Sequence, residues 1–186
     1  MASGIPTDDL IKEYAARLDE TVRDLLRKNP NEAEFRRPLD NLLEEFCQRA
    51  GLNPLAHAEY TLATGRADAV FNRLVLEYER PGALSGHLSH PRTRHAVDQI
   101  KRYIEGLATR QRQEMGRIAG VAFDGRYLVF IRYREGDFSV EAPAPVSQAS
   151  LERLLRWLAS LASGIALTAE NLSRDFSIEQ PRTRNA

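Results

Sequence analysis

The chain has 186 residues, of which 42% are hydrophobic and 28% charged, and its 26 basic and 26 acidic side chains cancel at pH 7. This composition excludes an intrinsically disordered chain and a polycation, and the length fits one domain with its own hydrophobic core. The single cysteine, Cys47, excludes a disulfide framework, and no apolar stretch is long enough to span a bilayer, so we expect a cytoplasmic protein without membrane contact.

The basic residues are almost all arginine, because lysine occurs only at positions 12, 28 and 101 and the other 23 are arginines. Arginine binds phosphate through two parallel hydrogen bonds, so this bias favours a nucleic-acid ligand. A GC-rich genome, whose codons also favour arginine, explains the bias equally well.

Two helices are predicted at the start of the chain, over 8–28 and 32–50, because apolar residues repeat there at helical spacing. Pro38 lies inside the second segment and is expected to kink the helix or to mark a broken first turn. Gly51 is expected to end this helix as a C-cap.

The pattern then changes to extended segments separated by loops and helices. Asp124 and Gly125 have the composition of a two-residue hairpin turn, and Ser150 is expected to cap the helix that follows it. The remaining predicted elements are strands over 55–61, 66–71 and 74–80, a loop over 81–92, a helix over 93–113, strands over 117–123, 126–134 and 138–141, a helix over 151–163 and a short helix over 168–175.

This order predicts an α/β (α+β) fold with a central mixed β-sheet flanked by helices. We expect residues 1–30 to form an amino-terminal helix packed on a core over 31–165. Residues 166–186 are expected to form a short helix and a polar tail that could lead to a further domain.

Three carboxylates are predicted to gather on the strands over 66–71 and 74–80. With Asn72 and Arg73 as a two-residue turn, Asp68 lies opposite Glu77 and Arg66 opposite Glu79. Side chains alternate along a strand, so Asp68, Glu77 and Glu79 share one face. Clustered carboxylates repel one another, and Mg²⁺, which prefers oxygen ligands, would relieve this repulsion. A solvated sheet face in which Arg66 pairs with Glu79 is the alternative.

The same segment resembles the signature of the PD-(D/E)XK, or restriction endonuclease-like, nuclease superfamily: an Asp, a hairpin turn, then Glu-x-Lys on the next strand. Asp68, Glu77 and Glu79 take these positions, with Glu79 where the superfamily has lysine. The resemblance implies a restriction-endonuclease-like core in which Asp68 and Glu77 bind Mg²⁺ or Mn²⁺. It also implies that Glu79 binds a second ion or activates water.

Two flanking segments extend the resemblance. EAEFRRPLDNLLEEF resembles the start of the amino-terminal nuclease domain in single-chain type I or type IIG-like restriction–modification enzymes, which implies that Glu34 assists catalysis. Asn31 and Glu34 also have the spacing of a capping box. The stretch from Gln99 to Tyr103 resembles a Gln-x-x-x-Tyr element of related nucleases, which implies that Gln99 orients a water or a phosphate. Tyr103 could equally belong to the apolar stripe of its helix.

Basic residues follow the predicted metal strands. The region 92–117 carries seven basic and three acidic residues, which suits the DNA backbone, although an ordinary polar helix face has the same pattern. His87 and His90 could reach a phosphate or be plain loop residues. The candidate nucleic-acid-binding residues are Arg66, Arg92, Arg94, Lys101 and Arg102.

The sequence thus predicts a divalent-metal-dependent DNA endonuclease of restriction–modification or phage-defence type, acting alone, as a homodimer, or with a methyltransferase or helicase partner. Two alternatives stay open. The replacement of lysine by Glu79 could leave a nuclease-like module that binds DNA or a protein without cutting. The chain could also be a regulatory domain of a larger restriction–modification enzyme.

Overall fold

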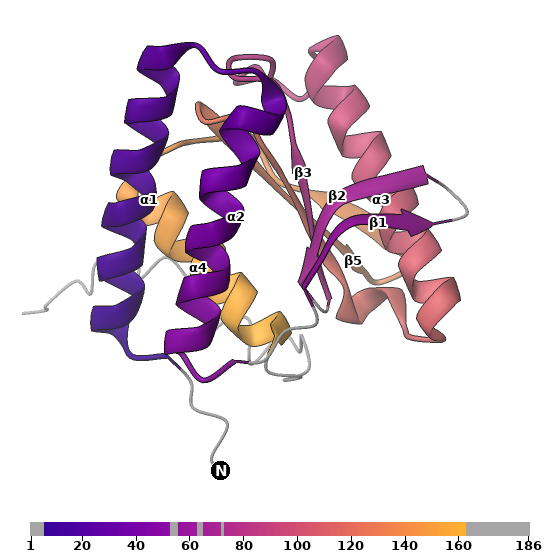
Figure 1. Cartoon of the computed structure of the whole chain (residues 1–186). Helices are drawn as coiled ribbons and strands as arrows, with labels where there is room; N and C mark the ends of the chain where they lie inside the picture. The colour runs from indigo at the N-terminus through magenta and orange to yellow at the C-terminus, as the bar shows by residue number, and fades with distance from the viewer. Residues whose placement is uncertain (1–5, 53–55, 63–64, 72, 163–186) are drawn as a thin grey trace, which may run out of the picture.

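A computed structural model describes residues 6–52, 56–62, 65–71 and 73–162, with the backbone alone for 56–62 and 65–67. The fold is α+β, with a mixed central sheet between layers of helices (Figure 1). The elements in chain order are α1 (Asp8–Lys28), α2 (Glu32–Arg49), β1 (Ala56–Leu62), β2 (Gly65–Phe71), β3 (Leu74–Tyr78), α3 (Pro91–Gln111), the 3₁₀ helix η1 (Met115–Arg117), β4 (Ala119–Phe123), β5 (Tyr127–Arg134), β6 (Asp137–Val140), β7 (Ala144–Pro145) and α4 (Gln148–Ala162).

The strands lie in the order β1-β2-β3-β4-β5-β6, and β7 pairs with β5. All neighbours are antiparallel except β3 and β4, which are parallel. A parallel pair needs a long crossover connection, and α3 provides it across one face of the sheet. Helices α1, α2 and α4 cover the opposite face (Figure 1).

Two separate hydrophobic cores form because both faces of the sheet are covered. Phe71, Leu74 and Tyr78 belong to the core that includes the buried faces of α1, α2 and α4. Val70 and Val75 point the other way and pack against α3. The two-residue alternation of the hairpin is therefore as predicted, but every side chain of β3 is buried, so polar residues on this strand lie away from bulk water.

Helix α3 approaches β4 closely at Gly120. A Cβ atom on Gly120 would overlap Ile100 Cγ2, so any larger residue would push the helix outward. This contact, which the sequence pattern did not reveal, sets the distance between the sheet and the polar residues of α3 one position before Ile100.

The structure corrects several predicted boundaries. Helix α2 continues through Pro38, and Gly51 follows the C-cap residue Ala50, with φ of +66°. The turn between β4 and β5 lies one residue later than predicted, because Asp124 N–H donates to the Tyr127 carbonyl.

The end of β3 and the start of α4 also differ from the prediction. Strand β3 ends at Tyr78, two residues earlier than expected, and Glu79 N–H donates to the Phe123 carbonyl. Helix α4 begins at Gln148, where Ser147 Oγ accepts from Ser150 N–H, so Ser147 rather than Ser150 caps it. The short helix predicted over 168–175 lies outside the described residues. Within the described part of the chain, no helix has both the length and the apolar character to cross a bilayer.

Candidate active site

The β2–β3 hairpin has the predicted register. The cross-strand pairs are Ala69 with Leu76, Val70 with Val75 and Phe71 with Leu74. Beyond the Ala69–Leu76 pair, the next hydrogen bond between the strands uses a side chain: the Tyr78 N–H donates to Asp68 Oδ2 at 2.9 Å. Asp68 is therefore fixed beside Glu77. The predicted pairing of Arg66 with Glu79 is not part of the β2–β3 ladder, because β3 ends at Tyr78.

Glu77 is the most deeply buried of the candidate residues, with 6% of its surface exposed. Its Oε1 accepts from Gln99 Nε2 at 2.5 Å, whereas its Oε2 is buried without a hydrogen-bond partner. Burial raises the pKa of Glu77 to about 9, and the charges of Asp68 and Glu79 contribute to this shift. Glu77 is thus a carboxyl group that is neutral at pH 7 unless a cation reaches it.

Glu79 lies just beyond the end of β3 and is half-buried. Burial raises the pKa of Glu79 to about 7, with contributions from the negative charges of Glu32, Asp68 and Asp124. Arg92, at the start of α3, opposes this shift, which places its guanidinium near Glu79. A carboxyl group with a pKa near neutrality can both accept and release a proton at physiological pH.

Glu32, which the sequence pattern did not single out, joins these carboxylates, whereas Glu34 does not. Glu34 forms the capping box of α2: its Oε2 accepts from Asn31 N–H at 3.0 Å, and its N–H donates to Asn31 Oδ1 at 2.9 Å. Burial raises the pKa of Glu32, and the charge of Asp68 adds to this shift. The capping-box spacing was the signal that Glu34 was already engaged, whereas no sequence signal singled out Glu32.

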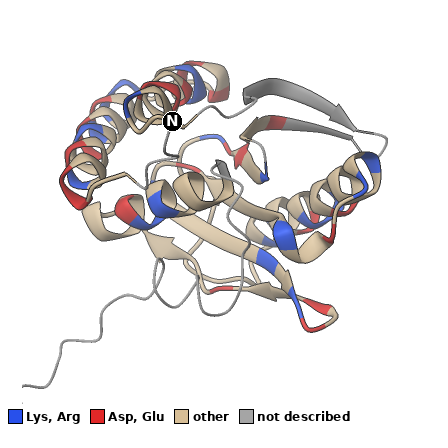
Figure 2. Cartoon of the chain, turned by 90° about the horizontal axis from the view of Figure 1, so that it is seen from below, with Lys and Arg blue, Asp and Glu red and all other residues tan. Residues whose placement is uncertain are grey.

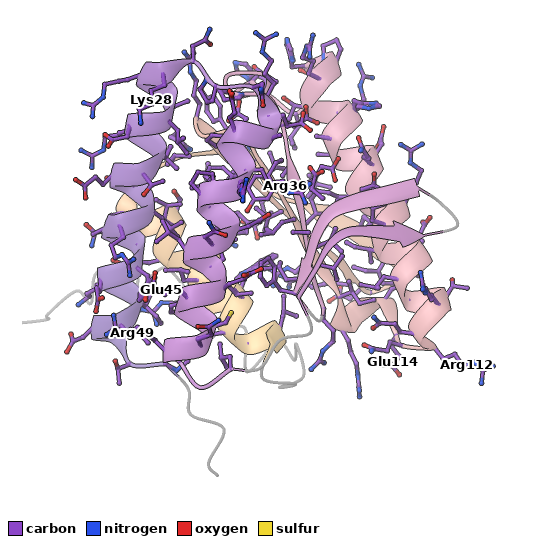
Figure 3. The ribbon with its side chains drawn as sticks, in the orientation of Figure 1. Lys28, Arg36, Glu45, Arg49, Arg112 and Glu114 are labelled. Atoms are coloured by element: carbon purple, nitrogen blue, oxygen red, sulfur yellow. The ribbon has the colours of Figure 1, made fainter. Side chains whose placement is uncertain are left out.

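Arg36 is the second residue that the sequence did not single out. Its Nη1 lies 3.1 Å from Asp68 Oδ1 and its Nε lies 3.1 Å from Asp40 Oδ2. Asp40 in turn accepts a hydrogen bond from the Tyr78 hydroxyl at 2.8 Å. Glu32, Arg36 and Asp40 are spaced four residues apart and so share one face of α2. Figure 3 shows Arg36 on the side of α2 that is turned toward the strands. Arg36 therefore places a positive charge, held from two sides, against the candidate ligand Asp68.

Gln99 and Tyr103 lie together on α3, as their spacing predicted. Gln99 Nε2 donates to the Tyr103 hydroxyl at 2.9 Å as well as to Glu77. Burial raises the pKa of Tyr103, whose ring also belongs to the core beneath α3. Gln99 thus holds the Glu77 carboxyl group directly.

The predicted nucleic-acid-binding residues lie in different surroundings. Arg92 is near Glu79, and Arg102 is near Tyr103, on whose pKa it has a lowering effect. Arg94 donates to the Ser89 carbonyl at 3.4 Å, and Lys101 Nζ lies 5.7 Å from the centre of the Phe138 ring. The side chain of Arg66 lies outside the described residues. Arg92 is therefore the basic residue of this group that is placed beside the carboxylates.

Acids within the sheet are unusual in this protein: charged residues lie mainly on the helices, and the described central strands carry few of them (Figure 2). Among the residues that the structure describes, no three His, Cys, Asp or Glu side chains already lie in positions to hold one metal ion. The donor chemistry nevertheless fits a divalent cation, because Glu77 Oε2 is a buried oxygen without a partner and Asp68 and Glu79 are near it.

Comparison with protein families, with curated proteins and with solved structures finds no match to this chain. A function for this protein therefore has to be inferred from its own arrangement of side chains.

Proposed function

We propose that this protein is a divalent-metal-dependent DNA phosphodiesterase with a restriction-endonuclease-like core. The observation that carries the proposal is the Glu77 carboxyl group, which is buried, has one oxygen without a partner and is surrounded by other acids. A buried carboxyl group without full hydrogen bonding is costly to a fold, so its presence calls for a ligand or a chemical role.

Asp68 and Glu77 are the residues that would hold Mg²⁺ or Mn²⁺, and Glu79 would hold a second ion or accept a proton from water. A bound divalent cation supplies charge that polarises a phosphoryl oxygen and stabilises a leaving oxygen. Gln99 holds Oε1 of Glu77 and leaves the second oxygen available to a ligand. The Tyr78 N–H holds Oδ2 of Asp68, and Arg36 Nη1 lies against its Oδ1, where a bound cation would compete with the guanidinium.

Glu79 is suited to proton transfer rather than to charge compensation. Its pKa of about 7 allows it to take a proton from an attacking water at neutral pH. Where the superfamily signature has a lysine on this strand, the nearby positive charges here come from Arg36 on α2 and Arg92 on α3. Arg92 would contact the phosphate, and Arg36 would position Asp68 without touching the substrate.

The decisive experiment combines metal binding with DNA cleavage in the purified protein. We expect Mn²⁺ to bind by calorimetry and to support nicking of supercoiled plasmid DNA, and both to be lost in Asp68→Ala and Glu77→Gln. Glu44→Gln is the matched control, because Glu44 is an exposed acid on α2 and its loss removes one charge without touching the cluster. Absence of both metal binding and nicking in the wild-type protein would contradict the proposal.

One observation favours a second candidate, a module that binds DNA without cutting it. Arg36 already compensates the charge of Asp68, and no lysine follows Glu77 at the signature position. This alternative predicts DNA binding that Asp68→Ala leaves unchanged, with no metal-dependent nicking. A regulatory domain of a larger enzyme would instead gain activity when the chain is lengthened.

A further inference from the structure

A second group of polar residues lies at the loop that follows Glu79 and at the start of α3. The loop after β3 and the start of α3 form an open pocket of about 330 Å³ that is lined by Arg80, Pro81, Gly82, Ala83, His90 and Arg92. This volume is at the lower end of the range for small-ligand sites.

Two arginines line this pocket and a third packs against its lining residue Gly82, and none of the three forms an ion pair with a described residue. Arg80 and Arg92 line it, and the Arg126 guanidinium lies against Gly82, with Cζ 3.5 Å from where a Cβ of Gly82 would stand. In the described part of the chain, none of the three has a carboxylate oxygen within 4.0 Å. Most other arginines of the described helices are paired with acids, so this group concentrates positive charge outside ion pairs, with Arg92 near Glu79 and Arg126 near Asp124 as its acidic neighbours.

The loop that carries the pocket is held in place by hydrogen bonds to a buried carboxylate. Asp124 is fully buried, and its Oδ2 accepts from the Leu84 N–H at 2.8 Å. Its Oδ1 accepts from the N–H groups of Arg126 and Tyr127, both at 2.8 Å. One buried carboxylate therefore fixes the pocket loop and the turn that carries Arg126 relative to each other.

We propose that this pocket binds a phosphomonoester, with Arg80, Arg92 and Arg126 as the cations and His90 as a further donor. Guanidinium groups match phosphate oxygens in geometry, and a dianionic terminal phosphate gains more from three cations outside ion pairs than a singly charged backbone phosphate does. The choice of a nucleic-acid end as the carrier of this phosphate rests on the proposed function. A free nucleotide carries the same group.

If the carrier is a strand end, the pocket has a consequence for the reaction. Arg92 contributes to the pocket and also lies near Glu79, so a terminal phosphate bound here would hold the strand at a fixed distance from the carboxylates. The enzyme would then measure its cutting position from a phosphorylated end.

The test uses the whole chain in EDTA, so that binding is measured without cleavage. The probes are a fluorescent single-stranded oligonucleotide with a 5′-phosphate, its 3′-phosphate and hydroxyl-ended counterparts, and a nucleoside monophosphate as competitor. We expect one phosphorylated end to bind about tenfold more tightly than the hydroxyl-ended strand, a difference that inorganic phosphate at millimolar concentration removes. Competition by the nucleoside monophosphate without any preference among the strands would keep the phosphate site and reject a strand end as its ligand.

The variants Arg80→Gln and Arg92→Gln should each abolish the preference. Arg112→Gln is the matched control, because it removes an exposed guanidinium at the other end of α3. Equal affinity for all strands without competition by the nucleoside monophosphate, or a preference that survives the loss of both Arg80 and Arg92, would overturn the proposal. The preference should persist in Asp68→Ala, so a protein that prefers phosphorylated ends but does not cut would refute only the proposed function.

Discussion

Two carboxyl groups lie near the ends of the neighbouring parallel strands β3 and β4, and both are almost fully buried, yet their surroundings differ. Asp124 is 0% exposed and accepts three backbone N–H groups from two separate loops. Glu77 is 6% exposed and accepts from Gln99 on one oxygen, while the other oxygen has no partner. Burial alone therefore does not separate a structural acid from a functional one, whereas the state of its hydrogen bonds does.

The largest expected effect comes from removing the satisfied acid. Asp124→Ala leaves three N–H groups without their acceptor, and we expect the free energy of unfolding to fall by about 3 kcal/mol or more in urea titrations. Asp124→Asn should lose roughly half as much, because its oxygen can still serve Arg126 and Tyr127 while its NH₂ group faces the Leu84 N–H. An Asn variant as stable as the wild type would show that the loop does not depend on this carboxylate.

Removing Arg36 tests how much its ion pairs with Asp68 and Asp40 contribute to the free energy of unfolding. Arg36→Gln leaves Asp68 and Asp40 without their cation, and we expect a loss of about 2 kcal/mol because all three side chains are less than 20% exposed. The matched variant Arg17→Gln breaks an ion pair with Glu45 whose side chains are 37% and 45% exposed. It should cost clearly less than Arg36→Gln in the same titration, because solvent screens an exposed pair. Equal losses would mean that the Arg36 pair is no more than a surface contact.

The pH dependence of stability isolates Glu77. Its pKa is raised from 4.5 to about 9 in the folded protein, so the folded state holds a proton that the unfolded state releases between these values. Stability from this group is fully present below pH 4.5 and is lost as the pH rises through 9, with a slope of up to about 1.4 kcal/mol per pH unit. Glu77→Gln should flatten this slope between about pH 7 and 9, above the pKa of Glu79. Urea titrations across this pH range measure the slope, and an unchanged slope in the variant would contradict the assignment to Glu77.

The smallest effects separate the two acids at the start of α2. Glu34→Ala should lower the free energy of unfolding by about 1 kcal/mol or less, because it removes one capping interaction. Glu32→Gln should leave stability nearly unchanged but lower the pKa of Glu79, since the Glu32 charge raises it. Carbon NMR of the Glu79 carboxyl group measures this shift, with Glu34→Ala as the control that should not move it.

The sequence predicted those parts of the site that depend on local patterns. Turn composition and strand alternation placed Asp68 beside Glu77, and helical spacing placed Gln99 beside Tyr103. These relations span at most about ten residues, or a single helix, so the periodicity of the chain encodes them. The general architecture, a mixed sheet flanked by helices, followed from the order of these segments.

The contacts that depend on how helices are placed against the sheet could not be predicted. The Arg36–Asp68 ion pair joins residues 32 positions apart, and Asp124 reaches Leu84 across 40 positions. The face that α2 turns toward β3 depends on the packing of its whole apolar side, which one sequence does not specify. The loss of Glu34 to the capping box was visible in the spacing, but the role of Glu32 became clear only from its place near Asp68.

The parallel pairing of β3 with β4 also bears on how the chain folds. The hairpin of β2 and β3 joins neighbouring segments of the chain, whereas β3 meets β4 only after the whole of α3 has crossed the sheet, so we expect the hairpin contacts to form before the parallel contacts. Until α3 arrives, Glu77 faces water and is ionised at neutral pH. Because burial under α3 raises the pKa of Glu77 to about 9, we expect docking of this helix to be coupled to the uptake of a proton at neutral pH.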